Sequence, residues 1–488
     1  MTPSPKYLIT CCLLTIYTNL FSQYVFEWNT YFDNHSLEQV RSITKGPDNY
    51  IYIAGLAQDT SDVIWLLKID ASGKKVMSKF YGGFKSIDPV KIITTKDKKL
   101  AIIATATEPD TAKKRIWLGK IDLNGNLLWE RLFAGVGVAM PTDVVQTPDS
   151  GFAISGYSAI DNFNYPDWYI IKADKYGYFQ WERSFGSQYD DRATSLTLMY
   201  DSTIVVGGFI SFGFGDFKKG NITKINLKGD YIWAKDFKFG SWSSINTLHS
   251  TSDSNLLIVA ELMKEPLLNF DTYIYKLDNN ADVIWQYQVD SNIMEHPVSI
   301  IETYDQGYAL AYTWKKDGYG NTNVAAIKIS PLGNLIWNIV FYRKSDDFAS
   351  QITEGPDNSL IIGASTNSLD KSWNYGVVKY RSIEASDLKF IKPYNKTISI
   401  NTNNLPVEGY ILGYKKPKLL KIYNNRNFVD SIADFQIYTS KINSYYVQSN
   451  IALKQGYNEI DFVVTDYKDY KFVRTLKVYF IPTPKPIW

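Results

Sequence analysis

Cysteine, histidine and unbalanced charge are all scarce in this 488-residue chain, and each shortage excludes a class of site. The only two cysteines, Cys11 and Cys12, lie close to the N-terminus, so we expect no disulfide framework and no cysteine-bound zinc in the rest of the chain. The three histidines, His35, His249 and His296, are not joined by a His-x-x-x-His or His-Glu spacing, and we therefore expect neither a metal site nor a cofactor. The net charge is only +2, and no block of five or more like charges occurs, which argues against nucleic acid as a partner.

Long apolar runs are also missing, since none reaches the roughly 18 residues that a membrane-spanning helix needs. Residues 1–22 contain one lysine, then the apolar run Tyr7 to Tyr17, and end in Leu20-Phe21-Ser22. This pattern is typical of a secretory signal peptide, cleaved before Gln23, and it would remove both cysteines. We expect a secreted protein, at the cell surface, in the periplasm or outside the cell. A lipoprotein signal ending at Cys11 is the weaker alternative, because the apolar stretch before it is too short.

Aromatic residues are plentiful and predict an all-β protein. They make up 15% of the chain, with 36 tyrosines and 13 tryptophans, and flat side chains pack well on half-buried strands. The tryptophans also reveal a repeat of 52 residues, because several recur at that interval, with Met77 one step earlier: Trp129, Trp181, Trp233, Trp285 and Trp337. A fixed period of this size is typical of propellers and solenoids.

Aspartate and lysine columns follow the same repeat and count seven units. The aspartates are Asp48, Asp97, Asp149, Asp201, Asp253, Asp305 and Asp357, and the lysines are Lys68, Lys120, Lys172, Lys224, Lys276, Lys328 and Lys379. Each unit is predicted to hold four strands, placed in the second unit at about 88–95, 99–107, 115–121 and 126–133. The third and fourth strands are joined by turns such as Asp122-Leu123-Asn124-Gly125, in which glycine accepts a positive φ. Ala281 replaces that glycine in the fifth unit and predicts a slightly different turn there.

Two further columns describe the strands themselves. An aliphatic residue stands five places before each aspartate and should lie in the core: Ile43, Ile92, Val144, Leu196, Leu248, Ile300 and Ile352. In six units a small residue, such as Gly156, stands seven places after the aspartate, which we interpret as allowing neighbouring sheets to approach closely.

The ends of the repeat complement each other. The seventh unit runs out after Lys379, whereas the segment from Tyr24 to Tyr31 around Trp28 resembles a fourth strand without partners. We therefore predict a seven-bladed β-propeller over residues 23–383, in which this N-terminal strand completes blade seven and covers its edge. Pairing of residues 386–391 with blade seven is the alternative.

With these columns the repeat resembles bacterial secreted propeller repeats of the pattern Asp-x-Gly-Phe followed by Lys-Ile-Asp-x-x-Gly-x-x-x-Trp. Asp149 to Phe152 and Lys120 to Trp129 show it best. The resemblance implies architecture and no particular activity. The second half is also similar to pyrroloquinoline-quinone-like propellers, including outer-membrane assembly lipoproteins, whose repeats are shorter. An assembly scaffold is therefore one alternative function.

The repeat stops near Ser386, and residues 386–488 are predicted to form a second, β-sandwich domain. The run Leu453 to Ile460, followed by Phe462 to Asp466 and by Leu476 to Phe480, resembles bacterial immunoglobulin-like domains attached to secreted glucan-acting enzymes. The resemblance implies a spacer or adhesive accessory.

The seven aspartates could suggest acid or metal chemistry, but structural pairing is the simpler interpretation. In five units the aspartate precedes the lysine by 23 residues, and both should stand at the same end of one sheet, where they can pair. Thr147 to Gly151 and Thr303 to Gly307 also match part of a sialidase Asp-box, although the aromatic residue that ends the box is missing. We identify no catalytic residue.

The loops between the second and third strands vary from unit to unit, as binding loops on a rigid scaffold do. Their aromatic residues are the candidate binding residues, because aromatic faces beside polar groups suit sugars or proteins: Tyr165, Phe212, Phe214, Trp314, Tyr319 and Trp373. We expect a monomeric, non-catalytic scaffold that binds a glycan or a protein partner. The alternative is a polysaccharide hydrolase or lyase, which a cluster of two or three carboxylates at the loop face or central channel would favour.

Overall fold

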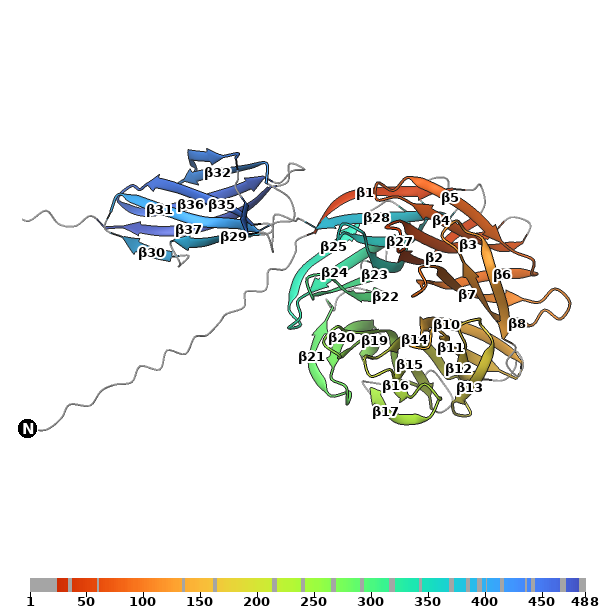
Figure 1. Cartoon of the computed structure of the whole chain (residues 1–488). Coiled ribbons are helices and arrows are strands. Elements are labelled where there is room, and N and C mark those ends of the chain that lie inside the picture. The colour runs from red at the N-terminus through yellow and green to blue at the C-terminus, as the bar shows by residue number, and fades with distance from the viewer. Residues whose placement is uncertain are drawn as a thin grey trace, which may run out of the picture. The chain divides into compact units, whose positions relative to one another are not determined.

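The computed structural model describes residues 24–481 apart from 34–36, 59–60, 134–136, 161–164, 213–216, 238–241, 265–268, 290–293, 316–320, 342–344, 368–372, 383–386, 393–396, 401, 413–416, 435–436, 440–443 and 466–470. The predicted signal segment, His35, Phe214 and Tyr319 thus lie outside the described residues. The described part of the chain is all-β and holds no helix (Figure 1). The chain divides into two compact units, Gln23–Ser382 and a unit that includes Ile383–Trp488.

The first unit is a propeller-like array of antiparallel, four-stranded sheets around a common centre (Figure 1). Among the described residues there are seven such sheets, six of which follow chain order. Their strands are β2 (Leu37–Lys45), β3 (Ile51–Gln58), β4 (Asp62–Ile69) and β5 (Lys75–Tyr81); β6 (Ser86–Thr94), β7 (Leu100–Thr107), β8 (Lys114–Ile121) and β9 (Leu127–Phe133); β10 (Val138–Gln146), β11 (Phe152–Ala159), β12 (Asp167–Ala173) and β13 (Phe179–Phe185); β14 (Arg192–Leu198), β15 (Ile204–Ser211), β16 (Lys218–Ile225) and β17 (Tyr231–Phe237); β18 (Ser243–Ser250), β19 (Leu256–Lys264), β20 (Asn269–Leu277) and β21 (Val283–Gln288); β22 (Met294–Glu302), β23 (Tyr308–Lys315), β24 (Thr322–Ile329) and β25 (Leu335–Phe341).

The remaining sheet joins the two ends of the repeat. It contains β26 (Asp347–Glu354), β27 (Leu360–Thr366) and β28 (Asn374–Ser382), with β1 (Tyr24–Phe32) as its outermost strand. Trp28 pairs with Lys379 and Phe32 with Tyr375, which is the pairing predicted for the segment around Trp28. The alternative is wrong, because β29 (Asp387–Lys392) pairs with a strand of the second unit.

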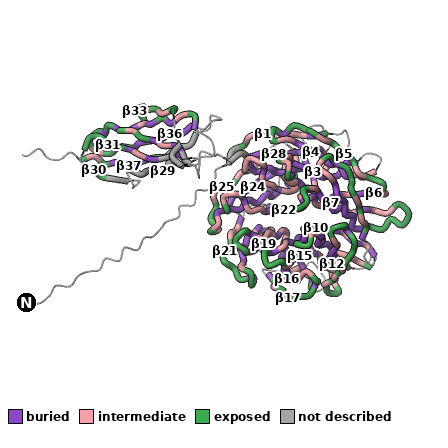
Figure 2. The backbone as a smooth tube through the Cα atoms, viewed as in Figure 1, coloured by how far each residue is buried: buried purple, intermediate pink, exposed green. Residues whose placement is uncertain are grey.

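Burial falls from the second and third strands of each sheet to the fourth (Figure 2). β3, for example, is buried along almost its whole length, whereas most residues of β5 are exposed. The aliphatic column lies in the core as predicted, with every member at most 6% exposed.

Each first strand carries a β-bulge opposite the second strand, for example between Pro141 and Asp143. A Cβ on Gly156 would lie 2.1 Å from the carbonyl oxygen of Met140 in the same sheet, so the small residue there serves this bulge. A Cβ on Gly55 would also lie 2.3 Å from the hydroxyl of Tyr375 in a neighbouring sheet, so close approach of sheets, as predicted, applies at that position.

The tryptophan column connects neighbouring sheets. Trp181 Nε1 donates to the carbonyl of Leu227 at 3.0 Å, and Trp285 Nε1 donates to that of Pro331 at 2.9 Å, each in a turn of the next sheet. The turn glycine lies under the indole ring of the preceding sheet, because a Cβ on Gly177 would lie 2.6 Å from Trp129. Ala281 adopts the same turn with φ of 64°, so the prediction of a different turn in the fifth unit is wrong.

The second unit consists of two sheets that share one core cluster. One sheet has the order β29, β31 (Asn404–Leu412), β35 (Ser444–Ala452) and β34 (Ile437–Thr439). The other has the order β30 (Thr397–Ile400), β37 (Lys471–Phe480), β36 (Gly456–Thr465), β32 (Leu419–Asn424) and β33 (Asn427–Ile432). The predicted run from Leu453 to Ile460 leads into β36, at the centre of this five-stranded sheet.

Candidate functional site

Each sheet of the first unit has two unlike ends. The turns between first and second strands and between third and fourth strands lie at one end, called here the turn end. The loops between second and third strands lie at the other, called here the loop end. The repeated aspartates and lysines lie at the turn end, whereas the candidate binding residues were predicted for the loop end.

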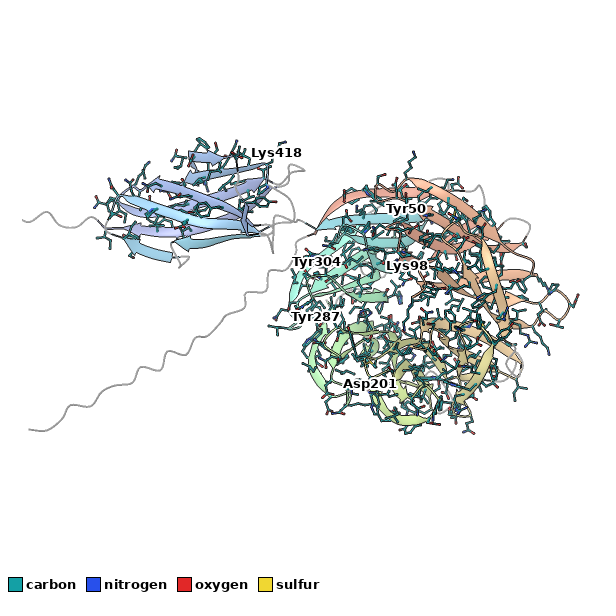
Figure 3. The ribbon with its side chains drawn as sticks, in the orientation of Figure 1. Tyr50, Lys98, Asp201, Tyr287, Tyr304 and Lys418 are labelled. Atoms are coloured by element: carbon teal, nitrogen blue, oxygen red, sulfur yellow. The ribbon has the colours of Figure 1, made fainter. Side chains whose placement is uncertain are left out.

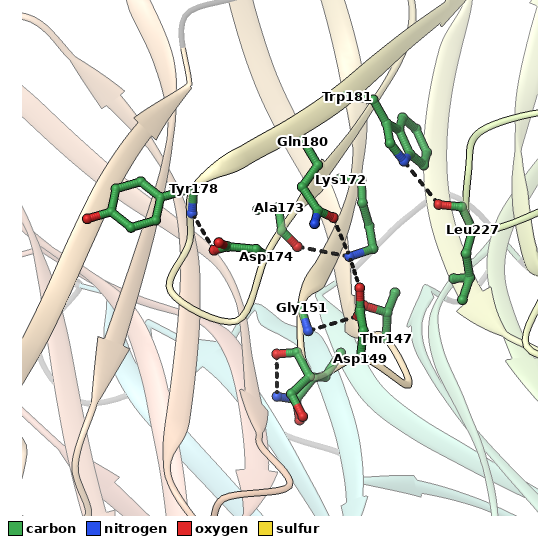
Figure 4. Close-up of polar contacts among 12 residues, drawn as sticks. Thr147, Asp149, Gly151, Lys172, Ala173, Asp174, Tyr178, Gln180, Trp181 and Leu227 are labelled. Carbon is green, nitrogen blue, oxygen red and sulfur yellow. Dashed lines mark hydrogen bonds and ion pairs between the residues drawn. The ribbon is translucent and has the colours of Figure 1, made fainter.

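At the turn end, all seven aspartates form ion pairs with the lysine of their own sheet. The Nζ to carboxylate distances lie between 2.5 and 2.8 Å, and each lysine side chain is at most 12% exposed. In the third sheet the Asp149 carboxylate accepts from Lys172 at 2.8 Å and from the amide of Gly151 at 3.0 Å, and the Thr147 hydroxyl also donates to it (Figure 4). This confirms the structural interpretation of the aspartate and lysine columns.

The electrostatics of these pairs agree with that role. Burial of Asp201 raises its pKa, but hydrogen bonds from Lys224 and Thr203 outweigh burial and lower the pKa to about 2. The pKa values of Asp48, Asp97, Asp149, Asp253 and Asp357 are lowered in the same way. Tyr50, labelled in Figure 3, adds a cation–π contact, with its ring centroid 4.4 Å from Lys68 Nζ. Each of these carboxylates is thus held by a lysine and by hydrogen bonds of its own sheet.

At the loop end the structure separates the candidate binding residues. Tyr165 is 60% exposed and Phe212 is 45% exposed, and the Phe212 ring lies 6.0 Å from that of Phe217, which is 47% exposed. Trp373 is half-buried, and its ring lies 5.3 Å from that of Phe348. Tyr165 and Phe212 belong to the adjoining third and fourth sheets, whereas Trp373 belongs to the last sheet.

The assignment of Trp314 to a binding loop is wrong. Trp314 lies within β23, opposite Asn323, and is only 7% exposed in a core cluster with Tyr312. The second strand of each sheet is covered by neighbouring sheets on both faces, so a tryptophan near its end packs inside although the sequence around it is polar.

A group of charged residues lies at the loop end of the third and fourth sheets. We call Tyr157, Asp167, Asp190, Asp191, Arg192 and Lys218 the loop-end cluster. Arg192 Nε lies 2.7 Å from Asp190 Oδ1, and the guanidinium lies 4.8 Å from the ring centroid of Tyr157. Lys218 Nζ lies 3.9 Å from the other Asp190 oxygen. The Arg192 and Asp190 side chains are 41% and 24% exposed, so a ligand can reach this pair.

The two other carboxylates of the cluster differ in hydrogen bonding. Asp191 is fully buried and accepts from the backbone amides of Ser211, at 2.7 Å, and of Ser187. Asp167 Oδ1 is buried without a hydrogen-bond partner among the described residues. Burial, assisted by the negative charge of Asp191, raises the pKa of Asp167. Sequence reasoning missed the cluster, because its members come from four separate segments that only the fold brings together.

Sequence reasoning also missed a column of polar residues on the bulged first strands. The residue six places before each aspartate is polar and connects neighbouring sheets in most cases. Ser42 Oγ accepts from the amide of Ile92 at 3.0 Å, and Gln351 Oε1 accepts from the amide of Ile43 at 3.1 Å. Asp143 accepts from Ser195 Oγ at 2.8 Å and lies 2.8 Å from Lys91. The repeat contained the signal, because every position in this column is polar: Ser42, Lys91, Asp143, Ser195, Thr247, Ser299 and Gln351.

The two described histidines, His249 and His296, are not arranged as ligands of a metal ion. His249 is half-buried, its Nε2 accepts from the amide of Glu302 at 3.2 Å, and desolvation lowers its pKa to about 4. His296 Nδ1 lies 3.2 Å from Glu261, whose hydrogen bond raises the histidine pKa. Within the described ranges no three His, Cys, Asp or Glu residues gather as metal ligands, and no helix could cross a membrane.

Comparison with known proteins gives no family. No family model and no curated protein matches the chain. Among solved structures, the periplasmic gluconolactonase of Pseudomonas aeruginosa is 9% identical with a TM-score of 0.42, over 61% of this chain and 85% of that one. The exo-β-1,3-galactanase of Phanerochaete chrysosporium is 10% identical with a TM-score of 0.32, over 88% and 92%. A puromycin hydrolase is 10% identical with a TM-score of 0.45, over 77% of this chain and 58% of that one. The chain thus spans little more than half of the length of that hydrolase, and likenesses this distant assign no activity.

Proposed function

We propose that this chain is a secreted, non-catalytic binding scaffold: a seven-bladed β-propeller, closed by β1, with an immunoglobulin-like C-terminal module. Its loop end recognises a glycan or a protein partner. The contacts between the first strands of successive sheets, and between β26 and β2, support the closed ring. The two sheets around one core support the sandwich-like module.

The observation that carries the proposal is the loop-end cluster with its exposed aromatic neighbours. Arg192 and Asp190 offer several hydrogen-bonding groups that remain partly exposed, and Tyr165, Phe212 and Phe217 offer apolar faces on the same two sheets. A rigid aromatic surface flanked by polar groups provides contact area together with specific hydrogen bonds. The turn end differs, because its repeated charges are already paired within the sheets.

The test replaces the aromatic faces and measures binding. The double variant Tyr165→Ala/Phe212→Ala should bind the partner found on a glycan array or a surface-protein display at least about tenfold more weakly, the loss that one or two buried contact residues cause. Tyr200→Ala/Tyr231→Ala is the matched control, since these tyrosines are 66% and 61% exposed and lie in the turn between β14 and β15 and at the start of the outer strand β17. Equal affinity in both double variants would refute the loop end as the binding surface.

A second function, polysaccharide cleavage, is favoured by one observation. Three aspartates of the loop-end cluster lie near one another, and the raised pKa of Asp167 suits a general acid. The other two are already engaged, Asp191 by backbone amides and Asp190 by Arg192. Release of reducing ends from a polysaccharide by the parent chain, and its loss in Asp167→Asn with unchanged binding, would establish the enzyme and overturn the scaffold.

A further inference from the structure

The outer face of the five-stranded sheet in the second unit carries two pairs of aromatic side chains. Tyr457 in β36 lies directly opposite Tyr479 in β37, and both are about half exposed, at 49% and 50%. Tyr423 in β32 lies opposite Phe428 in β33, with ring centroids 5.9 Å apart, and Phe428 is 59% exposed. Aromatic pairs at opposed strand positions usually stabilise a sheet, but here much of each ring surface stays in contact with water.

The strand register places both pairs on one face. Tyr423 lies opposite Asp461, and Asp461 is four residues after Tyr457 in the same strand, so all three side chains point the same way. The alternating residues of the same strand, Asn458, Ile460 and Phe462, are buried on the other face. With about 3.3 Å per residue and about 4.8 Å between strands, the centres of the two pairs lie about 16 Å apart.

Polar groups lie between the two aromatic pairs. Asp461 accepts from Thr475 Oγ1 at 2.7 Å, and Glu459 accepts from the Tyr457 hydroxyl at 3.1 Å and stands opposite Lys477. Among the side chains of this face that the structure describes, the two carboxylates of Glu459 and Asp461 are matched by the two ammonium groups of Lys477 and Lys421. A balanced face neither attracts nor repels a charged polymer strongly, so its complement is an uncharged ligand that forms many hydrogen bonds.

We propose that this face is a second binding site, for an extended neutral polysaccharide. Pyranose rings carry C–H groups on their faces, which pack against tyrosine and phenylalanine, and hydroxyl groups at their edges, which the polar residues between the two pairs hydrogen-bond. Two aromatic pairs about 16 Å apart on one sheet face suit a chain of several sugar units and not a single sugar. The inference is independent of the loop end, because it uses none of its residues.

The experiment applies the full-length chain and its variants to an array of neutral and anionic polysaccharides and of neutral oligosaccharides of increasing length. Tyr457→Ala/Tyr479→Ala and Tyr423→Ala/Phe428→Ala should each weaken binding to the neutral polymer about thirtyfold. Tyr457→Phe/Tyr479→Phe keeps both rings and should retain most of the affinity. Oligosaccharides too short to reach both pairs should respond to only one of the two alanine variants.

Controls separate this site from exposed tyrosines elsewhere and from misfolding. Tyr200→Ala/Tyr231→Ala replaces exposed tyrosines outside both proposed sites and should leave binding of the neutral polymer unchanged, and circular dichroism should show parental melting for every variant compared. The proposal is overturned if the parent retains no neutral polysaccharide, or if the two alanine variants bind as the parent does. A dimer that either alanine variant abolishes, with no polysaccharide retained, would assign the face to a second copy of the chain and also overturn it.

Discussion

The two ends of the repeated sheets carry similar charged residues in different roles. At the turn end, seven copies of one aspartate–lysine pair sit in seven copies of one turn, and each carboxylate is held by groups of its own sheet. At the loop end, the Asp190–Arg192 pair occurs once, where the third sheet connects to the fourth, and has no counterpart in the repeat. Repetition thus accompanies structural roles in this molecule, and departure from the repeat indicates where recognition can occur.

We expect the largest effect on stability when acid protonates the turn-end carboxylates. A carboxylate whose pKa is lower in the folded state than in the unfolded state stabilises the fold above about pH 4, and this stabilisation is lost as the pH falls through the folded value. For Asp201 that window runs from its ordinary value of 3.8 down to about 2, and five further turn-end aspartates are shifted in the same direction. Melting temperatures followed by circular dichroism should therefore drop steeply between pH 4 and about pH 2.

Removing one turn-end carboxylate gives the next largest effect. Lys328 is fully buried and Asp305 is 7% exposed, so Asp305→Ala removes the carboxylate paired with a buried ammonium and should cost about 3–5 kcal/mol in urea unfolding. Arg192→Ala at the loop end should cost less than about 1 kcal/mol, because Asp190 remains partly solvated. Asp305→Ala/Lys328→Met should recover part of the loss. Similar costs for Asp305→Ala and Arg192→Ala would contradict the distinction between the two ends.

Substitution of a turn glycine should give the third largest effect on stability. Gly177 has φ of 80°, and a Cβ there would lie 2.6 Å from Trp129 of the preceding sheet, so Gly177→Ala should cost about 2 kcal/mol of unfolding free energy. Ala281 already occupies the equivalent position, where its methyl group is buried. Ala281→Gly relieves the positive φ but loses that methyl contact, and should change stability by less than about 1 kcal/mol. Since Trp233 packs against the cluster that contains Ala281, the pair of measurements compares the same turn position beside two different tryptophans.

The sequence predicted what the repeat encodes and missed what only the fold assembles. The 23-residue spacing from Asp149 to Lys172 was sufficient to predict their ion pair, because five of the seven units repeat it. Trp314 was misplaced, since local polarity at a strand end does not reveal that two neighbouring sheets cover it. The loop-end cluster could not be predicted, because Asp167, Asp190 and Lys218 belong to unrelated segments that meet in space. The polar column of Ser42 and Asp143 was readable, but the bulge that turns these side chains toward a neighbouring sheet was not.

The smallest expected effect concerns a strained position that every sheet repeats. The residue directly after each turn-end aspartate has a positive φ and is never glycine: Asn49, Lys98, Ser150, Ser202, Ser254, Gln306 and Asn358. Asparagine tolerates this conformation better than lysine does, because its short polar side chain bonds locally. Lys98→Gly should therefore raise the unfolding free energy by about 0.5 kcal/mol, because the relief of strain exceeds the entropy that glycine adds to the unfolded chain. Asn49→Gly should be neutral or slightly destabilising. Thermal melting of the two variants side by side decides the point. An equal gain in both would mean that the strain belongs to the turn itself, independent of the side chain that occupies it.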